Sequence, residues 1–243
     1  MDLGIKDRVF IVTGGGSGIG AAVSEVLAEE GAVPVILARR PPDAGWLAGL
    51  PAAEFVQADL SDDAQCRSAV ALVRGRHARI DGLVNNAGAN DSVGIDAGPR
   101  AFRDSLNRNL VHYYTLVHLL ADDLRAAKGA IVNVSSKTAL TGQGNTSAYV
   151  AAKAAQLGGR LSAGRGPGQC RDPGRSHDPA LRQLAENIRR SRSAACRDNP
   201  EHPAWPPHDD SAGNCRCSRL SAVASVVPYN RAMGFSGWRL YPS

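Results

Sequence analysis

An α/β fold with a doubly wound parallel sheet is predicted for residues 1–157 of this 243-residue chain, and two observations support it. Short apolar runs rich in β-branched residues alternate with longer segments of helical periodicity. Glycine-rich or polar residues directly follow several of the apolar runs, as they do at the carboxyl ends of parallel strands. This alternation predicts one domain whose sheet is covered by helices on both faces.

The apolar pattern and the capping residues place the individual elements. Strands are expected at residues 9–12, 33–38, 54–57, 82–84 and 130–134. Helices are expected at residues 21–30, 62–78 and 100–128, and a further one carries Tyr149 and Lys153. Asp62 or Ser61 is a suitable cap for the second helix. The stripe expected to face the core from the third helix consists of Phe102, Leu106, Leu110 and Tyr114.

A glycine-rich loop, Thr13–Gly20 (T-G-G-G-S-G-I-G), joins the first strand to the first helix. Glycines there let backbone N–H groups approach a pyrophosphate, and the positive end of the helix dipole favours the anion. A glycine cluster alone can also be a tight turn. The strand before it and the helix after it favour dinucleotide binding.

Arg39 and Arg40 follow the second strand, where no carboxylate stands to accept a ribose 2′-hydroxyl. A guanidinium at this place suits a 2′-phosphate, so NADP is favoured over NAD. The alternative is a pair of solvated loop arginines, because arginine is a common surface residue.

Tyr149 and Lys153 are four residues apart, so they share one face of a helix. A neighbouring cation stabilises a phenolate and lowers the pKa of tyrosine, which makes it a better base near neutrality. Ser136 begins the polar loop before this helix, and its hydroxyl is suited to hold a carbonyl or alcohol oxygen. Such Tyr–Lys pairs also occur on ordinary amphipathic helices, and the upstream glycine loop favours the catalytic interpretation.

Further polar residues follow the third and fourth strands. Asp59 follows the third strand, and residues 85–88 (N-N-A-G) end the fourth, at the crevice of a doubly wound sheet. Asn109 lies beside the apolar stripe of the third helix. His112 is expected to be a solvated or hydrogen-bonded helix residue rather than a catalyst, because nothing in the sequence pairs with it.

As a set, these residues resemble the short-chain dehydrogenase/reductase family over residues 6–157. The family's T-G-x-x-x-G-x-G loop is matched by Thr13, Gly14, Gly18 and Gly20. Its N-N-A-G is matched by residues 85–88 and its adenine-side aspartate by Asp59. Its catalytic four are matched by Asn109, Ser136, Tyr149 and Lys153. The resemblance implies a Rossmann-like fold and hydride transfer between C4 of a nicotinamide and a carbinol carbon.

The resemblance also implies individual roles. Tyr149 is the expected acid/base, Lys153 lowers its pKa and holds the ribose, and Ser136 positions the substrate oxygen. Asn109 is expected to organise a proton-relay water. The expected cofactor contacts are Thr13, Gly14, Gly16, Ser17, Gly18, Ile19, Gly20, Arg39, Arg40, Asp59, Leu60, Asn86, Ala87, Gly88, Tyr149 and Lys153.

Within the family, residues 134–138 and 142–147 resemble L-fucose and related sugar dehydrogenases. Polar side chains near the site suit a polyol, because a site that hydrogen-bonds hydroxyl groups rejects apolar analogues strongly. The side chains suited to this are Asn90, Lys137, Gln143 and Asn145. The expected substrate contacts are Asn90, Ser136, Lys137, Gln143 and Tyr149.

Residues 158–243 differ in kind from the rest of the chain. Residues 1–157 carry 15 basic and 16 acidic side chains, whereas the tail carries 13 Arg, no Lys and 7 acidic side chains. The tail also holds nine of the 14 prolines and four of the five cysteines. The family's later strands do not appear in it. We expect an irregular tail, with order ending near Leu157 and the C-terminal part of the fold missing or scrambled.

An out-of-frame translation accounts for this change. Read one base further on, the codons of residues 165–182 can encode G-V-R-V-N-A-V-I-P-A-E-V-M-T-P-L-Y-A. Those of residues 231–234 can encode G-Q-W-V, and those of residues 236–242 can encode V-D-G-G-Y-T-H. Some steps are forced: the Met233 codon followed by glycine gives Trp, and the codons of Trp205 and Trp238 give only Gly. The missing family elements then return in order, which predicts a frame break near Gly158.

Other interpretations of the tail are weaker. Cys215 and Cys217 with His202 and His208 lack the spacing of a zinc site, so no metal is expected. The tail's net charge of +6 would bind nucleic acid only nonspecifically. No apolar run is long enough for a membrane span, and the amino terminus lacks a leader. We therefore expect a cytoplasmic protein with a small alcohol or sugar substrate, in a family whose complete members are usually homo-oligomers.

Two functions follow from the sequence. The first is an NAD(P)-dependent oxidoreductase acting on a secondary alcohol, a ketone or a sugar carbinol such as that of L-fucose. The second is a non-catalytic nucleotide-binding remnant of a frame-shifted dehydrogenase gene.

Overall fold

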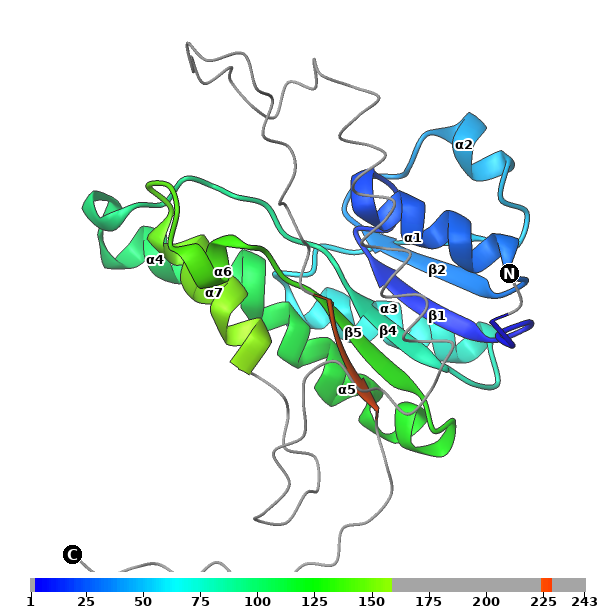
Figure 1. The fold of residues 1–243 in the computed structure, drawn as a ribbon. Helices are drawn as coiled ribbons and strands as arrows, with labels where there is room; N and C mark the ends of the chain where they lie inside the picture. The colour runs from blue at the N-terminus through cyan, green and yellow to red at the C-terminus, as the bar shows by residue number, and fades with distance from the viewer. Residues whose placement is uncertain (1–2, 159–223, 229–243) are drawn as a thin grey trace, which may run out of the picture.

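The computed structural model describes residues 3–158 and 224–228, and it confirms the α/β fold (Figure 1). The strands are β1 (Val9–Thr13), β2 (Val33–Ala38), β3 (Glu54–Gln57), β4 (Gly82–Asn85), β5 (Ala130–Val134) and β6 (Ala224–Pro228). The helices are α1 (Gly18–Glu29), α2 (Ala44–Ala48), α3 (Asp63–Arg76), α4 (Gly98–Leu106), α5 (His112–Ala126), α6 (Thr138–Thr141) and α7 (Ser147–Gly158). A 3₁₀ turn, η1 (Ile95–Ala97), precedes α4, and a π-helical segment, η2 (Asn107–Val111), joins α4 to α5.

The sheet has the strand order β3-β2-β1-β4-β5-β6. The first five strands are parallel, and β1 pairs with both β2 and β4, so the chain changes direction across the sheet at β1. The carboxyl ends of β1 and β4 therefore meet at the switch point, where doubly wound sheets bind their ligands.

Alternate residues of each strand pack into two separate apolar cores. Val9 and Ile11 of β1 belong to the core shared with α3 and α5, whereas Phe10 and Val12 belong to the core shared with α1. Figure 1 shows α1 and α3 on opposite sides of β1 and β2. The two-residue period of a strand and the helical period of its neighbours together produce this layering.

Most of the predicted elements are found at their expected positions. The bounds of β2, β3 and β5 agree with the sequence prediction, and Asp62 caps α3 by accepting from Ala64 N at 2.8 Å and Gln65 N at 3.3 Å. The short helices α2 and α6 were not expected. No helix among residues 3–158 combines the length and the apolar character needed to cross a bilayer.

The long helix predicted over residues 100–128 is interrupted by η2, which changes the face that it presents to the core. Tyr114, the last member of the expected stripe, is 64% exposed, while its neighbour Tyr113 is buried. A π turn contains an extra residue, so it rotates everything after it relative to an α-helical count. The stripe is therefore wrong beyond Leu110.

The tail contains one strand that the sequence did not predict. Residues 224–228 form β6, which pairs antiparallel with β5 through the register Val132↔Val226 (Figure 1). The expectation of an irregular tail is therefore wrong at these five residues. The other segments used in the frame argument, 165–182 and 231–242, lie outside the described residues.

Candidate active site

A cavity of about 450 Å³ opens at the carboxyl ends of the parallel strands. Its wall contains residues from the glycine loop, from the ends of β2, β3, β4 and β5, and from η2 and α7. The predicted cofactor residues on this wall are Gly14, Ser17, Ile19, Arg39, Asp59, Leu60, Asn86, Ala87, Gly88, Tyr149 and Lys153. The predicted cofactor residues outside it are Thr13, Gly16, Gly18, Gly20 and Arg40.

The glycine loop passes so close to the strand ends that side chains would not fit there. Gly14 has a φ of +62°, and a Cβ on it would lie 3.3 Å from the Ala87 Cα. A Cβ on Gly20 would overlap the carbonyl oxygen of Gly14. The Asn86 amide closes this contact by donating to Thr13 O at 3.0 Å and Gly14 O at 3.3 Å. This bare backbone at the start of α1 fits the pyrophosphate of a dinucleotide.

Thr13 lies just beneath the cavity and joins β1 to β4. Its hydroxyl accepts hydrogen bonds from Asn86 N at 2.9 Å and Ala87 N at 3.0 Å, and donates to Val84 O at 3.2 Å. Thr13 thus fixes the two strand ends that border the switch point, without lining the cavity itself.

Asp59 and Arg39 stand together at the end of the cavity bordered by β2 and β3. The Asp59 carboxylate accepts from the Ser61 hydroxyl at 2.7 Å and from Ser61 N at 3.0 Å. These hydrogen bonds, helped by the charge of Arg39, hold the pKa of Asp59 below its usual value. A carboxylate and a guanidinium are therefore both available for the adenosine half of a dinucleotide, whereas Arg40 lies outside the wall.

Three of the four catalytic candidates line the opposite end of the cavity: Asn109, Tyr149 and Lys153. A Cβ on Gly88 would lie 3.0 Å from Asn109 Oδ1 and 3.5 Å from Lys153 Nζ, so both side chains flank this glycine. The Lys153 Nζ is 5.6 Å from the centre of the Tyr149 ring. An ammonium, a phenol and an amide thus converge where the N-A-G turn leaves β4.

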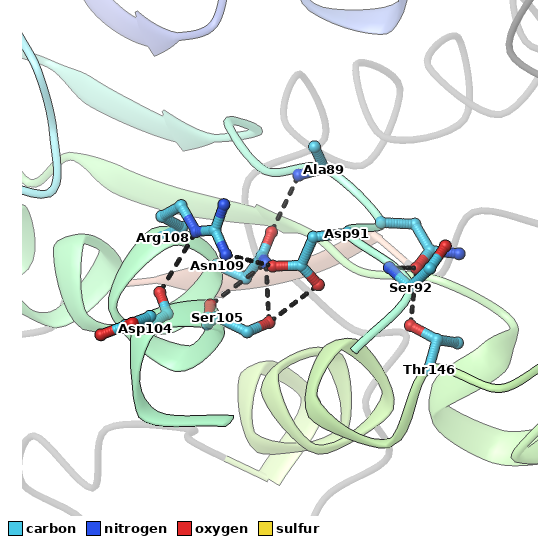
Figure 2. Close-up of polar contacts among 9 residues, drawn as sticks. Ala89, Asp91, Ser92, Asp104, Ser105, Arg108, Asn109 and Thr146 are labelled. Atoms are coloured by element: carbon cyan, nitrogen blue, oxygen red, sulfur yellow. Dashed lines mark hydrogen bonds and ion pairs between the residues drawn. The ribbon is translucent and has the colours of Figure 1, made fainter. Parts of the chain in front are cut away.

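Lys153 is only 3% exposed and is held by hydrogen bonds. Its Nζ donates to Val134 O at 2.9 Å and to the Tyr113 hydroxyl at 3.2 Å. Asn109 is equally buried, and its Oδ1 accepts from Ala89 N at 2.8 Å (Figure 2). Its backbone carbonyl accepts from Gln156 Nε2 at 2.6 Å.

Ser136, the fourth candidate, does not line the cavity. Its hydroxyl oxygen accepts from Thr138 Oγ1 at 3.0 Å and from Thr138 N at 3.3 Å. The preceding Ser135 lines the cavity instead, and its hydroxyl donates to Lys153 O at 2.7 Å.

The predicted substrate residues Asn90, Lys137 and Gln143 also lie outside the cavity wall. Asn90 Oδ1 is used within the protein, accepting from the Thr146 hydroxyl at 2.6 Å and from Ser92 N at 3.1 Å. It ties the loop after β4 to the residue that precedes α7.

Asp91 and Arg108 were missed by the sequence analysis and line the cavity next to Asn109. Asp91 accepts from the Ser105 hydroxyl at 3.0 Å, and its other oxygen pairs with Arg108 at 3.0 Å. Figure 2 shows this carboxylate turned toward the helical segment that carries Asn109. Their positions in the sequence could have indicated them, because Asp91 closely follows the N-N-A-G motif and Arg108 directly precedes Asn109.

His112 is buried rather than solvated, at 1% exposed, and it lies against backbone groups of Asn107 and Ala87. Burial lowers the pKa of His112 to about 4, so the imidazole is neutral near pH 7.

The described residues include no cluster of three His, Cys, Asp or Glu side chains that could hold a metal ion. The cysteines and histidines considered above for a metal site, at 202–217, lie outside the described part of the chain.

Comparison with known proteins agrees with this geometry. The short chain dehydrogenase family model matches residues 8–159. L-fucose dehydrogenase of Rattus norvegicus is 33% identical over 153 residues, covering 61% of this chain and 56% of the relative. The 3-hydroxyacyl-CoA dehydrogenase type-2 of Drosophila melanogaster is 32% identical over 208 residues, covering 76% of this chain and 81% of the relative. Residues 1–157 are a smaller share of the chain than this 76%, so the second alignment also includes residues outside them.

Solved structures give the same result. The crystal structure of Cj0485 dehydrogenase has a TM-score of 0.63 and 42% identity, covering 65% of this chain and 62% of that one. The aldohexose dehydrogenase of Thermoplasma acidophilum has a TM-score of 0.59 and 28% identity, covering 65% and 60%. The chain spans just over half the length of the L-fucose dehydrogenases that it matches. With the family match extending over most of the chain and the dinucleotide-type cavity at its switch point, the chain belongs to the short-chain dehydrogenase family.

Proposed function

We propose that this chain derives from an NAD(P)-dependent oxidoreductase that transfers hydride between a nicotinamide and a secondary alcohol, ketone or sugar carbinol. One observation carries the proposal: Tyr149, Lys153 and Asn109 line the same cavity as the glycine loop. A dinucleotide lying along this cavity has its adenosine half near Arg39 and Asp59 and its nicotinamide half near Tyr149.

A bound nicotinamide supplies the hydride donor or acceptor of the reaction. The protein's part is to move a proton and to hold the reacting oxygen. Tyr149 gives its phenolic proton to the carbonyl oxygen in reduction, or takes the alcohol proton in oxidation. Lys153 lies close enough to favour the phenolate electrostatically, and its burial strengthens that effect. Ser136 is proposed to hold the substrate oxygen, because the hydroxyl of Ser135 on the cavity wall already donates to Lys153 O at 2.7 Å.

We propose NADP rather than NAD as the cofactor. The support is Arg39, an exposed guanidinium on the cavity wall at the end of β2, where a 2′-phosphate on the ribose would find a cation. Asp59 lies across the same end of the cavity and is bonded to Ser61.

We propose a sugar as the substrate, with an L-fucose-like aldose first. The support is the likeness to L-fucose dehydrogenases and to a probable galactose dehydrogenase of Rhizobium meliloti, which is 34% identical over 162 residues. The polar cavity end at Asp91, Arg108 and Asn109 suits hydroxyl groups better than a flat hydrophobic ketone. The proposal also places the enzyme in the cytoplasm and in a homo-oligomer.

A second candidate is a non-catalytic nucleotide-binding remnant. It is favoured by the family match, which ends at residue 159, and by the short span of the chain relative to its relatives. The remnant would keep the glycine loop and lose the later part of the substrate wall.

The two candidates are separated by titrating the 243-residue chain with NADPH and NADH and then assaying L-fucose, D-galactose and a cyclic ketone. We expect NADPH to bind more tightly than NADH. Arg39→Ala should weaken NADPH binding about tenfold or more without affecting NADH, because it removes a charge-assisted contact. Arg40→Ala, outside the cavity wall, should change neither affinity.

Turnover of a sugar identifies the dehydrogenase, and NADPH binding without turnover identifies the remnant. Turnover of the ketone alone would remove the sugar assignment. If neither nucleotide binds, both candidates are wrong.

A further inference from the structure

Lys153 and Asn109 each have a cavity side and a buried side, and only the cavity side belongs to the proposed reaction. Behind them lie Tyr113 and Gln156, which are 4% and 3% exposed and do not line the cavity. A buried phenol and a buried amide are costly unless they are hydrogen-bonded, so their partners need an explanation.

The four residues form two contacts between α7 and the continuous helical run of η2 and α5. Asn109 and Tyr113 are four residues apart on the continuous run from η2 into α5, and Lys153 and Gln156 are three apart on α7. Residues at these spacings share a helix face. Tyr113 pairs with Lys153, and Asn109 pairs with Gln156.

The Tyr113 hydroxyl completes a small triangle around the ammonium. Lys153 Nζ donates to Tyr113 Oη at 3.2 Å and to Val134 O at 2.9 Å, and Tyr113 Oη lies 3.5 Å from Val134 O. The ammonium is also 5.3 Å from the centre of the Tyr113 ring. Two hydrogen bonds of the ammonium are therefore directed to α5 and β5, while Lys153 also lines the cavity.

The Tyr113 ring is itself fixed. His112 packs against it edge to face with ring centres 4.7 Å apart. Burial raises the pKa of Tyr113 far above its ordinary value, so its hydroxyl stays protonated and neutral. Tyr113 therefore serves Lys153 as a stationary neutral acceptor and does not exchange protons with it.

The contact between Gln156 and Asn109 holds the two elements in register. Asn109 lies in the π-helical segment η2, and its carbonyl accepts from Gln156 Nε2 at 2.6 Å. This bond spans α7 and η2 one helical turn away from the Tyr113–Lys153 contact, so it limits sliding between them.

We propose that Tyr113 is a positioning residue for Lys153, aiming the ammonium at the cavity, and that the Gln156–Asn109 bond keeps the two elements aligned. The proposal rests on the proposed function in that Lys153 acts on a bound dinucleotide and on Tyr149. Tyr113 itself touches neither the cavity nor the reacting atoms.

The test compares Tyr113→Phe with Tyr114→Phe in the full 243-residue chain. Both changes remove one phenolic oxygen from neighbouring residues, but Tyr114 is 64% exposed and stacks on His118. The chain has only four lysines, so ¹³C-labelled lysine gives a simple spectrum in which Lys153→Met identifies the Lys153 signal. NADPH affinity is measured on the same samples.

We expect Tyr113→Phe to move the Lys153 signal, leave the other three in place and weaken NADPH binding about three- to tenfold. Tyr114→Phe should do neither. In a Lys153→Met background, Tyr113→Phe should no longer affect NADPH affinity, because its effect passes through the lysine.

An unmoved Lys153 signal, or an effect that persists without Lys153, would overturn the proposal. So would a Tyr113→Phe chain that fails to fold or shifts all four lysine signals, since the hydroxyl would then support the whole core. If the unaltered chain binds no NADPH, the proposed function fails, while the Lys153 signal still decides the role of Tyr113.

Discussion

His112 begins α5 with both ring nitrogens inside the protein, and its neutral form is the one compatible with that place. An imidazolium there would lose its hydration, and the backbone groups of Asn107 and Ala87 would offset only part of that loss. Its burial therefore links the stability of the fold to pH more strongly than any exposed histidine can.

We predict that the free energy of unfolding falls as the solution becomes acidic. The unfolded imidazole takes up a proton near pH 6.5, whereas His112 in the fold does so only near pH 4. Between these pH values the unfolded state binds more protons than the folded state, so the population of unfolded chains grows as the pH falls. From this residue alone we expect a loss of about 2 kcal/mol between pH 7.5 and pH 5.

Urea unfolding at both pH values measures this loss in the unaltered chain, in His112→Leu and in His118→Leu. His118 lies on the exposed side of the same helix. The acid-dependent loss should shrink in His112→Leu and persist in His118→Leu. Equal loss in all three chains would show that other groups carry it.

A helical period lets the sequence predict which side chains share a face. The spacing of Tyr149 and Lys153 predicted their common face, and both line the cavity. Beyond a strand end no such period applies: Ser135 and Asp91 line the cavity, whereas the predicted Ser136 and Asn90 lie beside it.

At the level of elements, three residues of the loop after β4 fasten it to its surroundings through four contacts. Ala89 N binds Asn109, Asp91 binds Ser105 and Arg108, and Asn90 accepts from Thr146 (Figure 2). The loop thereby connects η2 with the start of α7, the two elements that supply the catalytic candidates. An α-helical period in the sequence does not reveal a π segment, so this connection could not be predicted from the pattern.

We predict that Asp91→Ala destabilises the chain by about 1–3 kcal/mol, because it leaves Ser105 without its acceptor and Arg108 without its partner. Arg108→Ala should cost less, about 0–1 kcal/mol, since the guanidinium is 52% exposed and water replaces much of its contact. The change is measured by urea unfolding at pH 7.5.

The matched control is Asp122→Ala, which breaks the surface pair with Arg125 and should change little. If Asp91→Ala and Asp122→Ala have equal effects, the loop is not fastened through Asp91. A second readout is the exchange rate of the Ala89 amide hydrogen, which should rise only in Asp91→Ala.

At the scale of the whole molecule, the parts of the chain before and after Gly158 differ in how far the sequence predicts their structure. The first part could be predicted because local pattern, glycine loop and strand order all agree. The position of β6 could not, since a single short apolar run in a proline-rich segment does not indicate a partner. The antiparallel pairing of β6 with β5 places residues 224–228 against the domain, and the alignment with the Drosophila enzyme covers 76% of the chain.

The out-of-frame origin of the tail remains our proposal, and it makes a prediction about two gene products. Sequencing the locus should show a frame break near the codon of Gly158. A chain made from the frame-restored gene should bind NADPH and turn over its sugar. The 243-residue chain should give no turnover, because it lacks the later substrate wall. The frame-restored segment would supply that wall and replace β6 at the sheet edge.

Unfolding and activity assays of both chains, made under identical conditions, measure the difference. The restored chain is expected to be the more stable, since a complete sheet with both faces covered buries more apolar surface. A Tyr149→Phe version of it should lose at least about a hundredfold in kcat while keeping its NADPH affinity, which ties the restored turnover to the phenol. Two results together would reject the frame break and make β6 a native part of the sheet. The locus would carry uninterrupted codons for residues 158–243, and the 243-residue chain would turn over a sugar.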